Sequence, residues 1–444
     1  MHLWLSVARF CAAAIAAWLI ALPVRAATVP SATGLDALAE QYVRLVLAVG
    51  EHDPNLVDAY YGPPQWREDA RAYKQSLETL AANARHLADR LNETRPTDPL
   101  SERRRRSLHE QLESVQTRLE ILRGTHLSFD EEARRIYGVA PPHHDDAFYL
   151  ALHRQLDAAL PGPGSLGERM DAFKKKFIVP PDRVRAALDA GLAACRGATL
   201  AHLTLPAAEN FKLELVQDKP WAAYNWYQGD YQSLIQVNVS LPIYARQMAG
   251  IMCHEGYPGH HLLNTLLEQR LVKARGWIEY TVYPLFSSES LLAEGTANFG
   301  KTLVFPNDSE WQWERDTLYP IAGIDPSLAE LNHRITQLNK LLAYAQIDAA
   351  RAYLDGTRSG AETIAWLQQF TFATADEAKR SLSFFDTYRS YVVNYRLGED
   401  LIQQHIDRVA GTDPNARWQA FVDLLASPPV VSDLARGTTL YPSR

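Results

Sequence analysis

Three histidines and a glutamate lie on a short segment that a proline and a glycine interrupt. The segment reads His254-Glu255-Gly256-Tyr257-Pro258-Gly259-His260-His261. Ten mostly apolar residues, 243–252, lead into it and predict a helix. Because Pro258 removes a helical hydrogen bond and clashes with the preceding turn, this helix must end or bulge there. The fold must therefore hold several imidazoles beside a distorted helix.

The histidine spacing leaves two candidates for the partner of His254 in a metal site. On an undistorted helix, seven residues turn about 700° and return His261 to the same face, whereas six send His260 to nearly the opposite face. Seven residues also rise about 10.5 Å, close to the limit for two imidazoles that share one ion. If two residues loop out, His260 takes the place of the second histidine in an H-E-x-x-H arrangement. We prefer His260, with His261 as the alternative ligand or as a group that supports a ligand or contacts substrate.

Glu294 is the predicted third ligand. It lies in a predicted helix, where a buried carboxylate must be paired or bound to a metal. Asn298, one turn later, is placed to hold a ligand by a hydrogen bond. Glu289 is an alternative carboxylate, but its serine-rich setting is more typical of a solvated helix start. Two imidazoles and a carboxylate are the ligands of a hydrolytic zinc site, so we predict a bound Zn²⁺.

The remaining sequence predicts a mainly α fold in a single large helical domain, with a small antiparallel β-sheet beside the helix of the metal site. Apolar residues recur three and four apart in residues 27–200, which predicts a helical scaffold. Alternating patterns at 211–216 and 234–239 predict two strands in a sheet and metal-site core of residues 206–300. Residues 301–444 are expected to be helical. The later helices are expected at 287–305, 326–355, 359–370, 374–409 and 414–436.

Two clusters in the first half of the chain are further candidates for the site. Residues 58–64 read Asp-Ala-Tyr-Tyr-Gly-Pro-Pro and predict an aromatic turn that begins with a carboxylate. Residues 143–146 read His-His-Asp-Asp and have metal-binding groups. Because two prolines precede this second cluster, we interpret Asp145 or Asp146 as the cap of a helix rather than as a metal ligand.

The first 26 residues predict a secretory signal peptide. Arg9 precedes an apolar run at 10–24, and small or permissive residues precede an expected cleavage site near Ala27. The alternative is an uncleaved membrane anchor. Cleavage is favoured because the run is shorter than the about 20 residues of a membrane span. We therefore expect a periplasmic or secreted protein of residues 27–444, without a stable membrane span after cleavage.

Composition and charge exclude some classes of protein. The chain has 444 residues, of which 47% are hydrophobic and 22% charged, so it is not a disordered chain. Its net charge of -7 argues against a nucleic-acid partner. After signal cleavage it would contain Cys195 and Cys253, which we interpret as two buried free thiols, with one disulfide as the alternative. The oligomeric state is left open.

These motifs resemble the bacterial family called domain of unknown function 885, which is regarded as similar to the gluzincin metallopeptidases. The likeness covers most of the mature chain, including 58–63 and 224–242. Its main elements are residues 254–261, Glu294-Gly295 and Asn394-Tyr395-Arg396-Leu397-Gly398. Two departures are Thr296, where the family often has tryptophan, and the segment 346–352, which lacks a histidine.

The resemblance implies a helical zinc-peptidase-like fold with a sheet edge available to an extended substrate. It implies His254, His260 or His261, and Glu294 as ligands. It also implies Glu255 as the base and Tyr395 as an oxyanion donor.

The predicted activity is hydrolysis of a peptide or small amide by a metal-activated water. Glu255 would take the proton of the water and deliver it to the leaving amine. Tyr395, or Arg396 beside it, would stabilise the oxyanion. The predicted substrate-binding residues are Tyr224, Asn225, Tyr257 and Arg396. The alternatives are a periplasmic protein that binds metal or peptide without catalysis, and a zinc hydrolase of esters or non-peptide amides.

Overall fold

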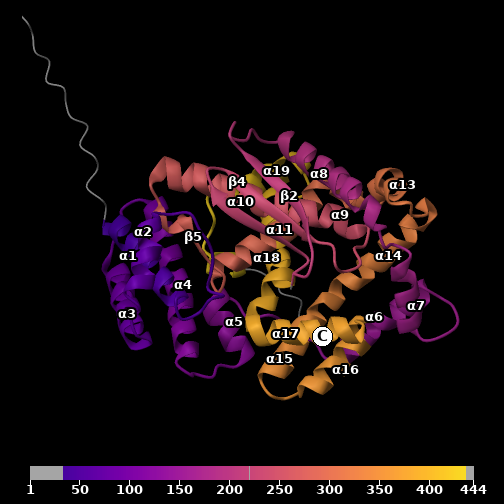
Figure 1. The fold of residues 1–444 in the computed structure, drawn as a ribbon, viewed down its shortest axis with the longest axis horizontal. Coiled ribbons are helices and arrows are strands. Elements are labelled where there is room, and N and C mark those ends of the chain that lie inside the picture. Colours follow the sequence, from indigo (N-terminus) through magenta and orange to yellow (C-terminus); the bar gives the residue numbers. More distant parts are fainter. Residues whose placement is uncertain (1–33, 220, 437–444) are drawn as a thin grey trace, which may run out of the picture.

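The computed structural model describes residues 34–219 and 221–436. This part of the chain is mainly α-helical with two small sheets, which confirms the predicted fold class (Figure 1). The predicted signal peptide lies outside the described residues. None of the described helices is long and apolar enough to cross a membrane.

The first half of the chain is mostly helical, with α1 to α4 at the left of Figure 1 and the purple helices α6 and α7 at its right. α3 packs against both α1 and α4, and the leucines at their contacts are buried. The helix α6 begins after Asp145, which accepts a hydrogen bond from the Phe148 N–H at 2.9 Å, so the capping interpretation is confirmed. The helices are α1 Gly34–Gly50, α2 Pro64–Ala72, α3 Leu77–Glu93, α4 Pro99–Leu122, α5 Phe129–Tyr137, α6 Asp146–Ala159, α7 Leu166–Lys175 and α8 Val184–Leu200, with a 3-10 turn η1 at Pro181–Arg183.

Two small sheets follow different strand orders. β1 (Val57–Tyr60) pairs antiparallel with β5 (Val282–Pro284), so part of the predicted aromatic turn is a strand. The second sheet has the order β2-β4-β3 and consists of β2 Asn210–Val216, β3 Ala223–Gly229 and β4 Gln232–Asn238.

The second sheet is mixed, so the prediction of an antiparallel sheet is wrong for one of its two strand pairs. β3 and β4 form an antiparallel hairpin, whereas β2 and β4 run parallel. The aromatic residues between the two predicted strands form β3 themselves. The chain therefore reverses twice between β2 and β4, which leaves these two strands pointing the same way.

After β4 the chain is helical apart from β5, and these helices are centred on α11 and α18 (Figure 1). The predicted helix at 374–409 is divided by the turn η9, where Arg389 has a positive φ of 52°. The elements are α9 Arg246–Ile251, η2 Met252–Gly256, α10 His260–Leu267, η3 Glu268–Lys273, η4 Ile278–Thr281, α11 Ser288–Val304, η5 Pro306–Asp308, α12 Glu310–Trp313, η6 Glu314–Leu318, α13 Tyr319–Ala322, η7 Pro326–Leu328, α14 Ala329–Asn339, η8 Lys340–Ala343, α15 Tyr344–Leu354, α16 Gly360–Thr371, α17 Ala375–Tyr388, η9 Arg389–Val392, α18 Val393–Ala410, α19 Pro414–Ala426 and α20 Val431–Ala435. Of the η segments, η2, η3 and η6 are π-helical and the others are 3-10 turns.

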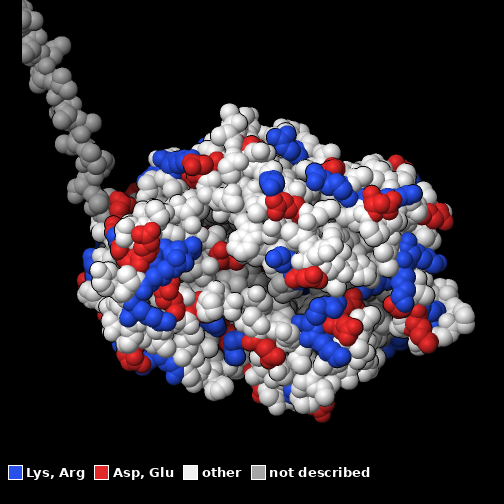
Figure 2. Space-filling view, viewed as in Figure 1, with Lys and Arg blue, Asp and Glu red and all other residues white. Residues whose placement is uncertain are grey.

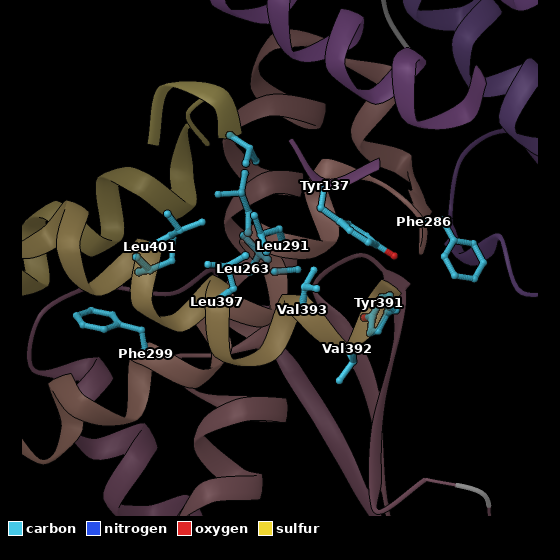
Figure 3. Packing of buried hydrophobic residues seen from close by; sticks show 14 of the residues in the cluster. Tyr137, Leu263, Phe286, Leu291, Phe299, Tyr391, Val392, Val393, Leu397 and Leu401 are labelled. Atoms are coloured by element: carbon cyan, nitrogen blue, oxygen red, sulfur yellow. The ribbon is translucent and has the colours of Figure 1, made fainter. Parts of the chain in front are cut away.

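A pair of glycines lets α11 and α18 approach each other closely. A Cβ on Gly295 would lie 2.6 Å from the backbone of Gly398, so a larger residue would force the helices apart. Around this crossing Leu263, Leu291 and Leu397 are buried in one apolar core (Figure 3). The crossing lies directly beside Glu294 in the sequence, so the core holds the predicted ligand on a rigid helix.

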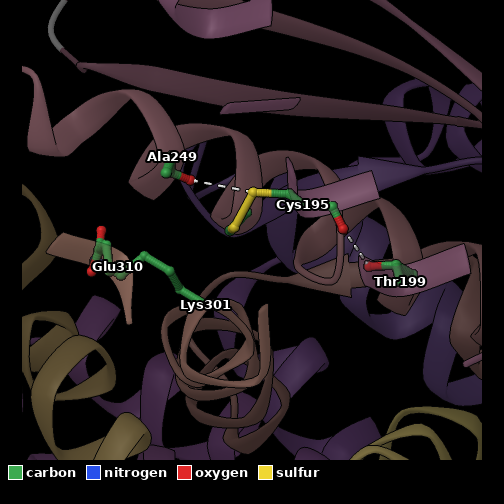
Figure 4. The surroundings of a disulfide bond; sticks show 6 residues. Cys195, Thr199, Ala249, Lys301 and Glu310 are labelled. Atoms are coloured by element: carbon green, nitrogen blue, oxygen red, sulfur yellow. Dashed lines mark hydrogen bonds and ion pairs between the residues drawn. A yellow bond between two sulfur atoms is a disulfide. The ribbon is translucent and has the colours of Figure 1, made fainter. Parts of the chain in front are cut away.

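A disulfide joins Cys195 of α8 to Cys253 of η2, so the prediction of free thiols is wrong (Figure 4). α8 approaches the α9 backbone closely at Gly191, which has no side chain. A Cβ on this residue would lie 2.8 Å from the main-chain oxygen of Met248. This packing brings the two cysteine Cα atoms to 5.4 Å. The sequence does not show which helices meet, so it could not reveal the pairing.

Removing this disulfide should lower the free energy of unfolding by about 4 kcal/mol, because a bridge across a loop of this length restricts the unfolded chain. The two cysteines are 58 residues apart. The Cys195→Ala/Cys253→Ala variant should therefore unfold at a lower urea concentration than oxidised wild type. Reduced wild type, which lacks the bridge but keeps both side chains, is the matched control. A midpoint equal to that of the oxidised protein would contradict the prediction.

Candidate metal centre

The helix that enters the histidine segment ends in a sharp turn. The π-helical η2 ends at Gly256, and Tyr257 then adopts an extended backbone with φ −124° and ψ 128°. A Cβ on Gly259 would lie 1.8 Å from the main-chain oxygen of His254, so only glycine permits this return of the chain. α10 then begins at His260. The turn at Pro258 and Gly259 therefore brings His260 back beside His254.

Three side chains converge at this turn. His254 Nε2 lies 3.1 Å from His260 Nε2 and 3.3 Å from Glu294 Oε2, and His260 Nε2 lies 3.8 Å from Glu294 Oε1. These distances resemble the about 3.3 Å between ligand atoms of a tetrahedral zinc with bonds of about 2.05 Å. Glu294 Oε2 is also buried, and its contact with His254 is an ion pair without well-formed hydrogen-bond geometry. The group fits a metal ion in its ligand types and spacing.

Two polar contacts orient these side chains. Asn298 Oδ1 lies 3.0 Å from His254 Nδ1, the contact expected from its place one turn after Glu294. The Tyr391 hydroxyl donates to Glu294 Oε1 at 2.8 Å. Such partners fix the orientation of metal ligands. No sequence motif singles out Tyr391; its spacing of four residues from Tyr395, about one helical turn, is the local signal that places it near the site.

The turn that carries Tyr391 is anchored from α5. Glu132 accepts hydrogen bonds from the Ser390 hydroxyl at 2.6 Å and from Arg389 Nε at 2.7 Å. Glu132 itself is buried. The scaffold helices therefore help to position Glu294 through η9, although no sequence pattern links these segments.

His261 faces away from the three converging side chains. Its Nδ1 lies 2.7 Å from the Ser233 hydroxyl, and its Nε2 lies 2.7 Å from Glu209 Oε1. The ring is fully buried, and both of its nitrogens are engaged by residues of the β2–β4 region. The structure therefore brings His260, and not His261, to His254 and Glu294.

Two predicted substrate-binding residues, Tyr257 and Arg396, are engaged by other side chains. Tyr257 is only 2% exposed, and its hydroxyl donates to Glu209, so it belongs to the interior network of His261. Arg396 donates to Glu399 and Asp400 on its own helix. These contacts hold both side chains. The sequence spacing indicated their neighbourhood but could not show the direction in which they point.

Glu255 is buried next to His254, and its main-chain oxygen accepts a hydrogen bond of 2.6 Å from Asn225 of β3. Burial raises the pKa of its carboxyl to about 7 against the opposing charge of His254, and the charges of Glu294 and Asp58 add to the rise. Glu289, the alternative ligand, lines a small cavity with Gln111 and Tyr280 and is not among the converging side chains.

The two candidate ligand histidines, His254 and His260, differ in their electrostatics. Burial lowers the pKa of His254, but the contact with Glu294 and the charge of Glu255 outweigh it and raise the pKa to about 9. Burial and then the charge of His254 lower the pKa of His260 to about 4. The Glu294 pKa is held below its usual value, because the histidine contacts outweigh burial. The neighbouring carboxylates thus favour a protonated His254, whereas His260 stays neutral.

Tyr395, Tyr224 and Asp58 adjoin this group. The Tyr395 ring packs edge-on against Tyr391 at 5.8 Å and remains 38% exposed. Local desolvation, followed by the charges of Glu294 and Glu255, holds the Tyr395 pKa well above its usual range, so the hydroxyl stays protonated. The Tyr224 hydroxyl donates to Asp58. The molecular face seen in Figure 2 is hollowed near its centre, between the elements labelled β5 and α18 in Figure 1.

Comparison with known proteins gives limited likenesses. No family model matches the chain, and no curated protein matches it. A candidate lipoprotein from Colwellia psychrerythraea is 13% identical, with a TM-score of 0.48 over 91% of this chain and 75% of that one. The M32 carboxypeptidase from Deinococcus radiodurans R1 is 13% identical, with a TM-score of 0.39 over 92% and 95% of the chains. The carboxypeptidase from Pyrococcus furiosus is 10% identical, with a TM-score of 0.41 over 93% and 97%. At these values we transfer no residue role, and the resemblance to domain of unknown function 885 stays a prediction.

Proposed function

We propose that this protein is a zinc-dependent hydrolase that cleaves peptide bonds. The observation that carries the proposal is the convergence of His254, His260 and Glu294 next to the buried Glu255. Three ligands of these types leave a fourth position for water, as in catalytic rather than structural zinc sites. The neighbouring carboxylate supplies the base that such a site needs.

Each residue has a defined part in the proposed mechanism. A zinc ion held by the three ligands would acidify a water molecule and polarise the substrate carbonyl. Glu255 accepts the proton of the attacking water and later donates it to the leaving amine. The Tyr395 hydroxyl, which stays protonated, donates to the oxyanion. Asn298 and Tyr391 keep their ligands in a fixed orientation.

The substrate is proposed to bind along β3. This strand lies at the edge of its sheet, with β4 as its neighbour in the described structure. Asn225 of β3 contacts the main chain of Glu255, so the edge adjoins the metal-ligand group. An exposed sheet edge can pair with an extended peptide through main-chain hydrogen bonds. Together with the predicted signal peptide, this proposal describes a periplasmic or secreted enzyme that acts on peptides.

Metal removal tests the proposal directly. The mature protein, purified without chelators, should contain about one zinc per chain. It should cleave members of a peptide library, lose this activity after dialysis against a chelator and regain it with added zinc. Protein that contains no zinc under these conditions would overturn the proposal. Bound zinc without cleavage of peptides or esters would support a binding protein, and cleavage of esters alone would support the other class of hydrolase.

A further inference from the structure

Asp58 is connected to the proposed active site through β3. It lies on β1, and the hydroxyl of Tyr224 on β3 donates a hydrogen bond to one of its oxygens. The next residue, Asn225, donates to the main-chain oxygen of Glu255 at 2.6 Å. Two consecutive residues of one strand therefore hold Asp58 on one side and the base segment on the other.

The Asp58 carboxylate has no cation to balance it within 34–219 and 221–436. Tyr224 is its hydrogen-bond partner there, and no lysine or arginine forms an ion pair with it. Burial raises its pKa to about 6 against the hydrogen bond from Tyr224, and the charge of Glu294 raises it further. A carboxylate in such a place is costly unless something positive pairs with it. The fold alone would be served equally well by asparagine, which can also accept from Tyr224.

The groups around Asp58 also suit a donor rather than an acceptor. Tyr224 packs against Trp226 at 4.4 Å and against Trp221 at 5.7 Å between ring centroids, and Trp226 is 42% exposed. Carboxylate oxygens and accessible aromatic faces are the groups that attract an ammonium or guanidinium ion. Recognition of a carboxylate would instead need a basic residue, and Arg396 is already held by Asp400 and Glu399.

We propose that Asp58, oriented by Tyr224, is a specificity-determining residue that binds a positively charged group of the substrate. This group is either the free α-amino group or the side chain of a lysine or arginine near the scissile bond. The inference rests on the proposed peptide hydrolysis and adds the substrate class. It predicts a preference for cationic peptides.

The test compares two pairs of peptides on the zinc-loaded protein. One pair has the same sequence with a free or an acetylated N-terminus. The other pair is acetylated and carries lysine or norleucine next to the bond that the library digest identifies. The readout is the ratio of kcat/KM for the charged and neutral members. Wild type should prefer the charged member of at least one pair, and Asp58→Asn should reduce that ratio by about tenfold or more, because a charge-assisted hydrogen bond is lost.

A matched variant separates local recognition from net charge. Glu214 on β2 of the three-stranded sheet pairs with Lys212, so Glu214→Gln also removes one negative charge, but away from Asp58 on β1. Its ratio should stay within about twofold of wild type, because an exposed ion pair contributes little. A response to Asp58→Asn in the N-terminal pair alone assigns the α-amino group, and a response in the lysine pair alone assigns the side chain.

The outcome separates failure of this inference from failure of the proposed function. Cleavage with equal ratios in wild type and Asp58→Asn, in both pairs, would overturn the role of Asp58 and leave the hydrolase intact. If no peptide of the library is cleaved, a free and acetylated pair, and an acetylated pair with lysine or norleucine at a central position, are compared by calorimetric binding to the zinc-loaded protein. A tenfold weaker affinity of Asp58→Asn for the charged member then supports cation binding, and equal affinities overturn it.

Discussion

Replacing Glu255 with glutamine should lower kcat for peptide cleavage by about 10²–10⁴-fold, because glutamine cannot accept the proton of the attacking water. Zinc should stay bound, since Glu255 is not among the three converging ligands. The substitution keeps the shape of the side chain and leaves untouched the main-chain hydrogen bond from Asn225. Metal content and kcat, measured on the same preparation, check both parts of this expectation.

Glu289→Gln is the matched control for Glu255→Gln. Glu289 is a glutamate on the helix of Glu294, and it lines a separate small cavity rather than the metal-ligand group. Its replacement should leave kcat within about twofold of wild type, because no proton transfer depends on it. If cleavage survives Glu255→Gln, or if both variants lose it equally, Glu255 is not the general base.

His260→Ala and His261→Ala should fail in different ways. His260→Ala removes a ligand nitrogen and should weaken zinc affinity by more than about 100-fold, beyond the effect of losing a partner that only orients a ligand. His261→Ala should retain zinc but lower the free energy of unfolding by about 3 kcal/mol. The reason is that it leaves Glu209 and Ser233 buried without the imidazole that contacts both.

Zinc titration against a competing chelator and urea unfolding, applied to both variants, separate these outcomes. His260→Gln is a useful companion, because it preserves volume and polarity at the helix start but presents a poor ligand for zinc. Metal release by His261→Ala in a protein that remains folded would reverse the assignment of the second ligand.

The helical architecture was largely predictable because helix formation depends on residues three and four apart. The buried leucines of α3 and α4 follow this spacing, and Asp145 caps α6 as its local sequence indicates. Strand pairing was less predictable. The parallel pairing of β2 with β4 depends on the formation of β3, whose aromatic residues carry no clear alternation.

The site illustrates a similar division. Residue types and their positions indicated His254, Glu255 and Glu294, and they reduced the remaining ligand to a choice between His260 and His261. The placement of a single turn decides that choice in space. Gly259 packs against the main-chain oxygen of His254 and folds α10 back. The partners of His261 come from segments that are 28 and 52 residues away, so no local pattern could show them.

The sequence by itself thus determined the helical class, the chemistry of the candidate metal ligands and the carboxylate beside them, because these follow from residue types and short spacings. Only the tertiary structure decided that Cys195 pairs with Cys253, that Tyr391 holds Glu294 and that Asp58 meets Tyr224. Each of these contacts joins segments far apart in the chain. The distances between these segments depend on how the helices and strands pack. This packing depends in turn on the sizes of the side chains and on how closely the main chains can approach.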